Sequence, residues 1–177
     1  MFEYTVAEIS SQIRSLPLVL SLWLRFLGAL NLSSVLLLRR RQARWVFGAI
    51  LFIIATNVPI FLSFGLVKLG SIPHLFVWIP LVIYLAKQVR SGQVDIKKPF
   101  GMWCFALMIL NLVSIVFDMR DGVQYLLGDH AAMPQGLSPT PPVPTLLAIV
   151  VVVFAAVRYS LGDSPSRTNV IHEPLER

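Results

Sequence analysis

The chain has 177 residues, 56% of them hydrophobic and 14% charged, and a formal net charge of +6. This composition, with a mean hydropathy of +0.73, lies outside the usual range of a soluble globular domain. The cations stand between apolar runs and are not interleaved with aromatic residues along one face, so the pattern argues against a nucleic-acid partner and favours anionic phospholipid.

The first sixteen residues predict an amphipathic helix at the membrane interface. Glu3 and Glu8 stand where a signal peptide would carry a basic region, so we expect no cleaved leader and a retained first span. Apolar residues at three- and four-residue spacing define the predicted helix, which ends at Pro17: Phe2, Val6, Ile9 and Ile13. A frayed terminus is the alternative.

Apolar runs then occupy most of the chain, and a spanning helix needs about 20 such residues. The runs cover residues 17–38, 45–66, 72–86, 100–117 and 143–157. The third and the fifth are short, and a re-entrant third segment is an alternative to a crossing. The sequence predicts an all-α integral membrane protein. One bundle of about five transmembrane helices is expected in residues 1–161, and a flexible cytoplasmic tail in residues 162–177.

The cations between the runs predict the orientation, because cytoplasmic segments carry an excess of Lys and Arg. With the N-terminus outside, eleven of them are cytoplasmic, against Arg14, Lys68 and Arg120 on the other side. We therefore expect an outer N-terminus and a cytoplasmic C-terminus, in a bacterial inner membrane. The residues expected to set the topology or to contact lipid headgroups are Arg39, Arg40, Arg41, Arg44, Lys97 and Lys98.

One cation, Arg25, falls inside the first run, about 12 Å from its start at the rise of an α-helix. A charge in hydrocarbon costs roughly 2.5 to 3.5 kcal/mol on insertion scales, so it needs a partner or an aqueous cavity. We expect an ion pair with Asp118 at the outer end of the fourth run, and a second hydrogen bond to Asn111. Other charges near the outer loop compete for this pairing: Arg120, Asp121 and Asp129.

Further polar residues inside the runs complete a predicted intramembrane polar site. In the fourth run Cys104, Asn111, Ser114 and Asp118 recur at helical spacing and share one face, with Cys104 as a buried thiol. In the second run Pro59 predicts a kink next to Asn57. The expected site, which is either structural or a small polar pocket, consists of Arg25, Asn57, Asn111, Ser114 and Asp118.

His74 and Trp78 lie one helical turn apart near the outer end of the third run. A histidine can relay protons or bind a metal or haem, but a metal needs several ligands. The other histidines are His130 in the outer loop and His172 in the tail. We therefore expect an interfacial His74–Trp78 pair in an aromatic belt, without a metal, and the sequence does not identify a cofactor.

The outer connection, residues 119–142, is expected to form a short surface helix at 120–127, followed by an extended proline-rich segment. No phosphate-binding glycine loop, nucleophile elbow or dinucleotide fingerprint occurs in the sequence. We expect a non-enzymatic accessory or structural subunit of a membrane complex, bound to a membrane protein partner or to copies of itself. One alternative is an oligomeric transporter or channel component that uses the intramembrane site. Another is a lipid-modifying enzyme with an outer acid and base among Asp118, Asp121, Asp129 and His130.

Overall fold

The computed structural model describes residues 2–131 and 143–162, and every regular element within them is helical. The elements are α1 (Val6–Arg14), α2 (Leu18–Leu32), the short 3₁₀ helix η1 (Ser33–Leu37), α3 (Arg41–Phe64), η2 (Lys68–Gly70), α4 (Ser71–Arg90), α5 (Pro99–Leu126) and α6 (Val143–Leu161). Five stretches are long and apolar enough to cross a membrane: Leu18–Leu37, Arg41–Phe64, Lys68–Arg90, Pro99–Leu126 and Val143–Leu161. The prediction of an all-helical chain with five candidate spans is confirmed.

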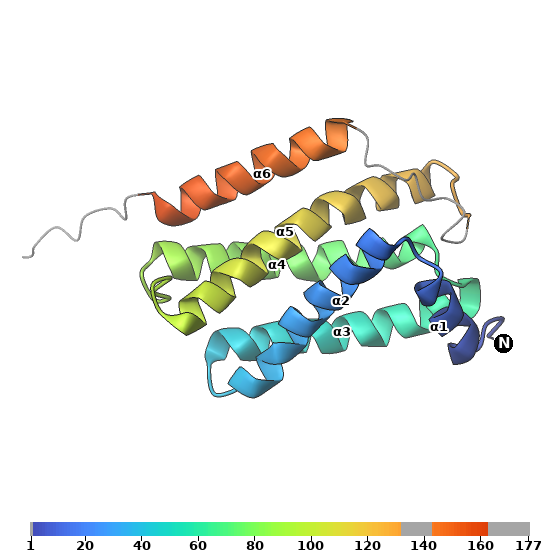
Figure 1. Ribbon diagram of the computed structural model, residues 1–177, viewed down its shortest axis with the longest axis horizontal. Coiled ribbons are helices and arrows are strands. Elements are labelled where there is room, and N and C mark those ends of the chain that lie inside the picture. The colour runs from blue at the N-terminus through green and yellow to red at the C-terminus, as the bar shows by residue number, and fades with distance from the viewer. Residues whose placement is uncertain (1, 132–142, 163–177) are drawn as a thin grey trace, which may run out of the picture.

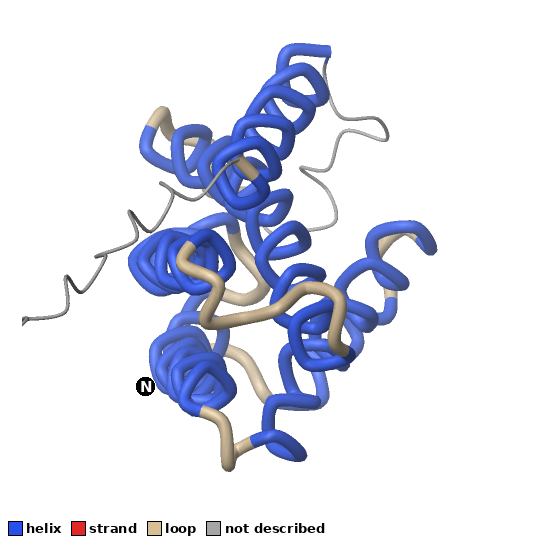
Figure 2. The backbone as a smooth tube through the Cα atoms, turned by 90° about the vertical axis from the view of Figure 1, so that its left-hand side faces the viewer, coloured by secondary structure: helices blue, strands red, loops and turns tan. Residues whose placement is uncertain are grey.

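The long helices run side by side, and each is antiparallel to the one before it (Figure 1). α4 and α5 form the middle of the bundle, with α3 on one side, α6 on the other and α2 crossing over them; Figure 2 looks along these helices. Over the most apolar 18 residues of each stretch, 39% of the residues are buried in η2 with α4 and 44% in α5. The corresponding shares are 11% in α2 with η1 and 6% in α6. The outer faces of α2 and α6 therefore expose apolar side chains, as lipid-facing helices do.

The core forms where α3, α4 and α5 meet. Its fully buried side chains include Val46 of α3, Leu85 of α4, and Leu107 and Met108 of α5. Cys104 is fully buried among them as a free thiol, as the sequence predicts. α6 is attached at its far end, where Ser160 donates a hydrogen bond to the Met108 sulfur at 3.5 Å.

α4 is longer than its apolar run, because the helix continues through the basic residues that follow. It is one continuous helix over Ser71–Arg90. The helix is therefore longer than the apolar run, whose short length was the reason to consider a re-entrant segment. Lys87 and Arg90 stand in its last turn, where cations interact favourably with the helix dipole. α3 likewise continues through Pro59, and the Thr56 hydroxyl donates to the carbonyl of Phe52 at 2.9 Å.

The prediction of a separate surface helix at 120–127 is wrong, because α5 continues without a break to Leu126. Gly122 lies buried against α4, where an added Cβ would lie 3.5 Å from Ser71 Oγ. This close packing holds the segment to the bundle. The helix ends at Leu126 with Leu127 as its C-cap, and Gly128 follows at φ +102°, a conformation that favours glycine. The predicted proline-rich segment and the tail from residue 163 lie outside the described residues.

The predicted N-terminal helix is present as α1, which begins with a capping box between Thr5 and Glu8. The Thr5 amide donates to Glu8 Oε2 at 2.7 Å, and this bond lowers the pKa of the Glu8 carboxyl. The segment packs on the end of α3, since the amides of Glu3 and Tyr4 donate to the Leu62 carbonyl at 3.0 and 2.9 Å. α1 is therefore docked on the bundle.

The antiparallel order gathers the cations at one end of the bundle, which we call the basic end. There α3 and α5 begin and α4 and α6 end, on the left of Figure 1. Its described cations are Arg39, Arg40, Arg41, Arg44, Lys87, Arg90, Lys97, Lys98 and Arg158. The opposite end holds α1, η2 and the end of α5, and its described cations are Arg14, Lys68 and Arg120.

Candidate functional site

The residues of the predicted intramembrane site lie in three separate places in the structure. Asn57 and Asp118 belong to a network with His74 near the end opposite the basic end. Asn111 pairs with Asn31 deeper in the bundle. Arg25 lies exposed on α2. The structure therefore does not bring these five residues together as one site.

Asn57, His74 and Asp118 form a polar network, which we call the His74 network, with one residue each from α3, α4 and α5. Asn57 Nδ2 lies 2.8 Å from His74 Nε2, and His74 Nδ1 lies 3.3 Å from Asp118 Oδ1. An amide nitrogen only donates, so Nε2 accepts from Asn57 and a neutral imidazole carries its hydrogen on Nδ1, which donates to Asp118. The network joins three helices at one level.

Several buried oxygens at this level have no hydrogen-bond partner within the described part of the chain. They are Asn57 Oδ1, Asp118 Oδ2 and, one turn before Asp118 on α5, Ser114 Oγ. Asn57 is only 5% exposed, so these atoms are shielded by the three helices. The His74 network therefore offers further hydrogen-bond acceptors to a donor that reaches it.

His74 and Trp78 do not form the predicted pair in an aromatic belt. Their rings are in edge contact, with centroids 6.5 Å apart, but Trp78 is buried in the core at 6% exposure. His74 is held by Asn57 and Asp118 and is not an isolated interfacial residue. The sequence contained a signal for this network, since Asn57, His74 and Asp118 fall at a similar depth in neighbouring antiparallel runs.

A second contact joins α2 to α5 through a pair of buried amides. Asn31 Nδ2 donates to Asn111 Oδ1 at 3.3 Å, and Asn111 Nδ2 donates to Asn31 Oδ1 at 3.4 Å. Both side chains are almost fully buried. Sequence reasoning missed Asn31, although an amide inside an apolar run is itself a signal of an interhelical hydrogen bond.

The predicted contact between Arg25 and Asp118 is wrong. Asp118 is engaged by His74, and Arg25 is exposed with no hydrogen bond or ion pair to any described residue. The reason is the rotation of α2, which buries Ser21 and Asn31. At 100° per residue, Arg25 lies about 120° around the helix from Asn31 and about 40° from Ser21, on the side of Ser21 that faces away from Asn31, and its side chain is exposed.

A charged cluster surrounds the end of α5 that lies opposite the basic end. Lys68 of η2 is only 2% exposed and forms an ion pair with Asp129 just beyond the helix. The hydrogen bond from Lys68 lowers the pKa of the Asp129 carboxyl, and a weaker bond from the Ala131 amide acts in the same direction. Asp121 lies close enough to Arg120, to this pair and to Asp118 to interact with each of them electrostatically.

The acid and base residues of the enzyme alternative are engaged separately. His130 donates from Nε2 to the Tyr125 carbonyl at 3.1 Å and its ring lies against the Tyr125 ring in a tilted contact, while Asp129 pairs with Lys68. In the described part of the chain, no three His, Cys, Asp or Glu side chains are grouped so that they could hold a metal ion.

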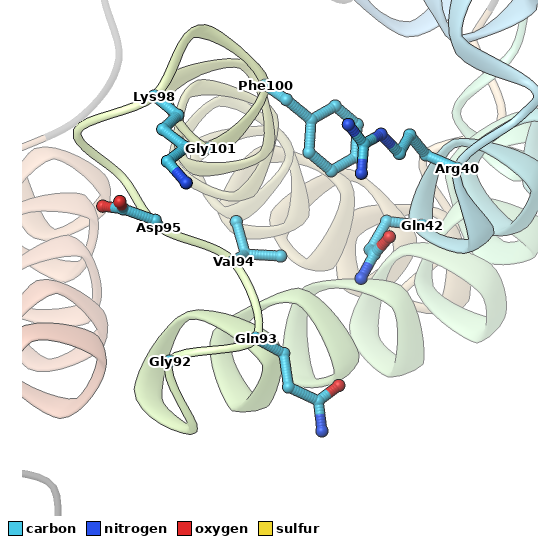
Figure 3. Close-up of a pocket in the computed structure, with 9 residues that line it drawn as sticks. All are labelled: Arg40, Gln42, Gly92, Gln93, Val94, Asp95, Lys98, Phe100 and Gly101. Atoms are coloured by element: carbon cyan, nitrogen blue, oxygen red, sulfur yellow. The ribbon is translucent and has the colours of Figure 1, made fainter.

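At the basic end, a cavity of about 310 Å³ lies between the start of α3, the connection 91–98 and the start of α5 (Figure 3). We call it the basic-end cavity. Of the six cations predicted to contact headgroups, Arg40 and Lys98 line it. Arg39, Arg41, Arg44 and Lys97 are exposed nearby and do not line it.

Comparison of this chain with protein-family models, with curated proteins and with solved structures found no match.

Proposed function

We propose that this chain is a multi-pass membrane protein with an outer N-terminus and a cytoplasmic C-terminus. In this proposal it is a non-enzymatic accessory subunit that binds a second membrane protein through α2. The observation that supports the proposal most strongly is Arg25, a cation on the exposed face of a helix long and apolar enough to span a membrane.

The depth of Arg25 makes its exposure costly. It is the eighth residue of the stretch Leu18–Leu37, about 10 Å from the outer end at helical rise. An arginine at the centre of a spanning helix costs roughly 2.5 to 3.5 kcal/mol on insertion scales, and such residues nearly always face protein or water. A bound partner would cover this guanidinium.

The surface around Arg25 suits the close approach of another helix. Gly28 follows one turn later, and an added Cβ there would meet no atom within 4 Å. Ala29 is exposed beside it, and the large side chains Leu22 and Leu32 flank the patch at 55% and 53% exposure. Small residues let helix backbones approach in a membrane, where packing and hydrogen bonds drive association.

The charge of Arg25 indicates the chemistry of the partner, which is an Asp or Glu in a transmembrane helix at matching depth. A second copy of this chain is a poor source. Within the described spans the only carboxylates are Asp118 and Asp121, near the outer end of α5, and Asp118 is already engaged by His74. We therefore propose a different protein as the partner.

The transporter alternative has less support. It requires Arg25, Asn57, Asn111 and Asp118 to line one path, whereas these residues lie in the three separate places described above.

Native membranes carrying the tagged chain, solubilised in mild detergent and analysed by mass spectrometry, test the proposal. We expect the wild type to retain a partner with an acidic residue in a transmembrane helix. Arg25→Gln should release it, and Arg25→Lys should retain most of it. Arg158→Gln is the matched control, because Arg158 is an exposed cation at the basic end of α6.

Exchange of the two charges between the chains should restore binding. A partner that survives Arg25→Gln at undiminished yield would refute the role of Arg25. Wild-type particles that contain only this chain and lipid would refute the accessory function itself.

A further inference from the structure

We propose that the basic-end cavity binds a phosphate group, either of a phospholipid headgroup or of a soluble phosphate ester. This site is independent of the α2 surface and goes beyond the accessory function. The cavity volume of about 310 Å³ is at the lower limit of small-molecule sites, which measure roughly 300 to 1,000 Å³, and suits a small polar group.

Two cations from different elements line the cavity. The Arg40 guanidinium lies 5.3 Å from the centre of the Phe100 ring, a cation–π contact that orients it before any ligand arrives. Lys98 extends on the other side of Phe100 (Figure 3). Neither cation forms an ion pair with an acid in the described part of the chain.

The one acidic residue in the lining does not neutralise these cations. Asp95 points away from Arg40 in Figure 3. Its carboxylate accepts the backbone amide of Lys97 at 3.0 Å, which keeps it on its own connection. The cavity therefore keeps an excess of positive charge, the electrostatic requirement for an anionic ligand.

Both helices that begin at the cavity add to this charge. Arg40 and Lys98 are the N-cap residues of α3 and α5, and neither start has a side-chain cap or an acidic residue in its first turn. The first N–H groups of a helix lack intrahelical partners and carry the positive end of the dipole. Here they reinforce a site that the two side chains define.

The wall of the cavity is held rigidly by packing at Gly101. A Cβ on Gly101 would overlap the backbone carbonyl of Asp95, so the connection 91–98 lies directly on the first turn of α5. Val94 is buried at 4% exposure, and its amide donates to the Gln88 carbonyl at 3.1 Å. A cavity with a fixed wall loses little conformational entropy when a ligand binds.

Phosphate binding to the purified full chain in neutral detergent tests the proposal. The probes are inorganic phosphate, glycerol phosphate and short-chain phosphatidylglycerol, with the matching diacylglycerol as the phosphate-free lipid. Thermal shift and native mass spectrometry report the binding. We expect at least one phosphate probe to bind saturably, and the diacylglycerol not to bind. Binding of phosphatidylglycerol alone identifies a headgroup site, and binding of the soluble probes as well identifies a phosphate-ester site.

The matched pair of variants separates the cavity from diffuse attraction. Arg40→Gln with Lys98→Gln should weaken binding about tenfold or more, equivalent to ~1.4 kcal/mol. Arg39→Gln with Lys97→Gln removes the same charge beside the cavity and should leave the affinity within about threefold of wild type. Equal losses in the two variants, or no saturable binding by wild type, would overturn the proposal. If the first variant does not fold, Lys98→Gln against Lys97→Gln makes the same comparison.

Discussion

At the scale of single residues, polar side chains decide which helices meet and at what level. The amides of Asn31 and Asn111 join α2 to α5, and His74 joins Asn57 to Asp118 across three helices. An amide that is buried in an apolar interior without a hydrogen-bond partner has lost its hydration and gained nothing in return. A shift of one helix along another would separate these pairs and lower the stability. Polar contacts of this kind specify the register of an otherwise apolar bundle.

The amide pair predicts a measurable coupling. Asn31→Leu and Asn111→Leu should each destabilise the protein, because each leaves one buried amide without its partner. The double variant should be more stable than the sum of the single losses predicts, by about 0.6 to 1.7 kcal/mol. Equilibrium unfolding in mixed detergent micelles measures the four proteins.

A control cycle combines Asn31→Leu with Asn57→Leu, since Asn57 contacts His74 and not Asn31. This cycle should be additive. Additive losses in the Asn31 and Asn111 cycle would show that the amide pair contributes no coupling.

At the scale of helices, the ends depend on contacts with neighbouring elements as much as on their own residues. α5 continues beyond its apolar run because Gly122 packs against α4 and Asp129 pairs with Lys68. α1 has its own capping box, yet its position depends on hydrogen bonds to the end of α3. α2 buries only Ser21 and Asn31, which leaves most of its surface for lipid or a partner.

The ion pair at the end of α5 predicts acid sensitivity. The folded-state pKa of Asp129 is lowered, chiefly by the hydrogen bond from Lys68. Its contribution to stability is therefore complete above the ordinary carboxyl value of about 3.9, and is lost as the pH falls through the lower folded value. Thermal unfolding followed from pH 7 to pH 3 should show wild type losing stability below about pH 4.

Asp129→Asn should be less stable than wild type at pH 7, because the buried Lys68 ammonium loses its partner. The difference between the two proteins should become smaller towards pH 3. The same difference at both pH values would contradict a role for the Asp129 charge. Lys68 is the first residue of its short helix, so proteolysis near η2 would report the same loosening.

At the scale of the whole molecule, the antiparallel order of the helices places the cations of connections distant in sequence at one end. Arg90 illustrates how the end is assembled, since its guanidinium donates to the Tyr159 carbonyl at 3.1 Å and lies 4.4 Å from the centre of the Tyr159 ring. This end is the side that we propose for the cytoplasm, where anionic headgroups attract Lys and Arg.

Cysteine labelling in intact cells tests the orientation. Cys104 is fully buried, so Cys104→Ser gives a background without a natural thiol. In that background Ser11→Cys should react with a membrane-impermeant maleimide added outside, since Ser11 is exposed on α1. Gln93→Cys, exposed at the basic end, should react only after permeabilisation. The opposite labelling pattern would reverse the proposed topology.

The sequence by itself determined the all-helical class of the protein and its five candidate spans, because the length of an apolar run and the charge beside it are local properties. It also predicted α1, the burial of Cys104 and the inward face of α5 that carries Asn111 and Ser114. These features follow from helical periodicity, which a single element specifies without reference to the others.

Only the tertiary structure decided which polar residues meet. The rotation of α2 pairs Asn31 with Asn111 and leaves Arg25 exposed. The level at which α4 and α5 pack against each other places Asp118 in contact with His74. Helix rotation and level result from the packing of many apolar side chains on helices distant in sequence. For the same reason the basic-end cavity, which is bounded by three separate segments, cannot be read from the positions of Arg40 and Lys98 in the chain.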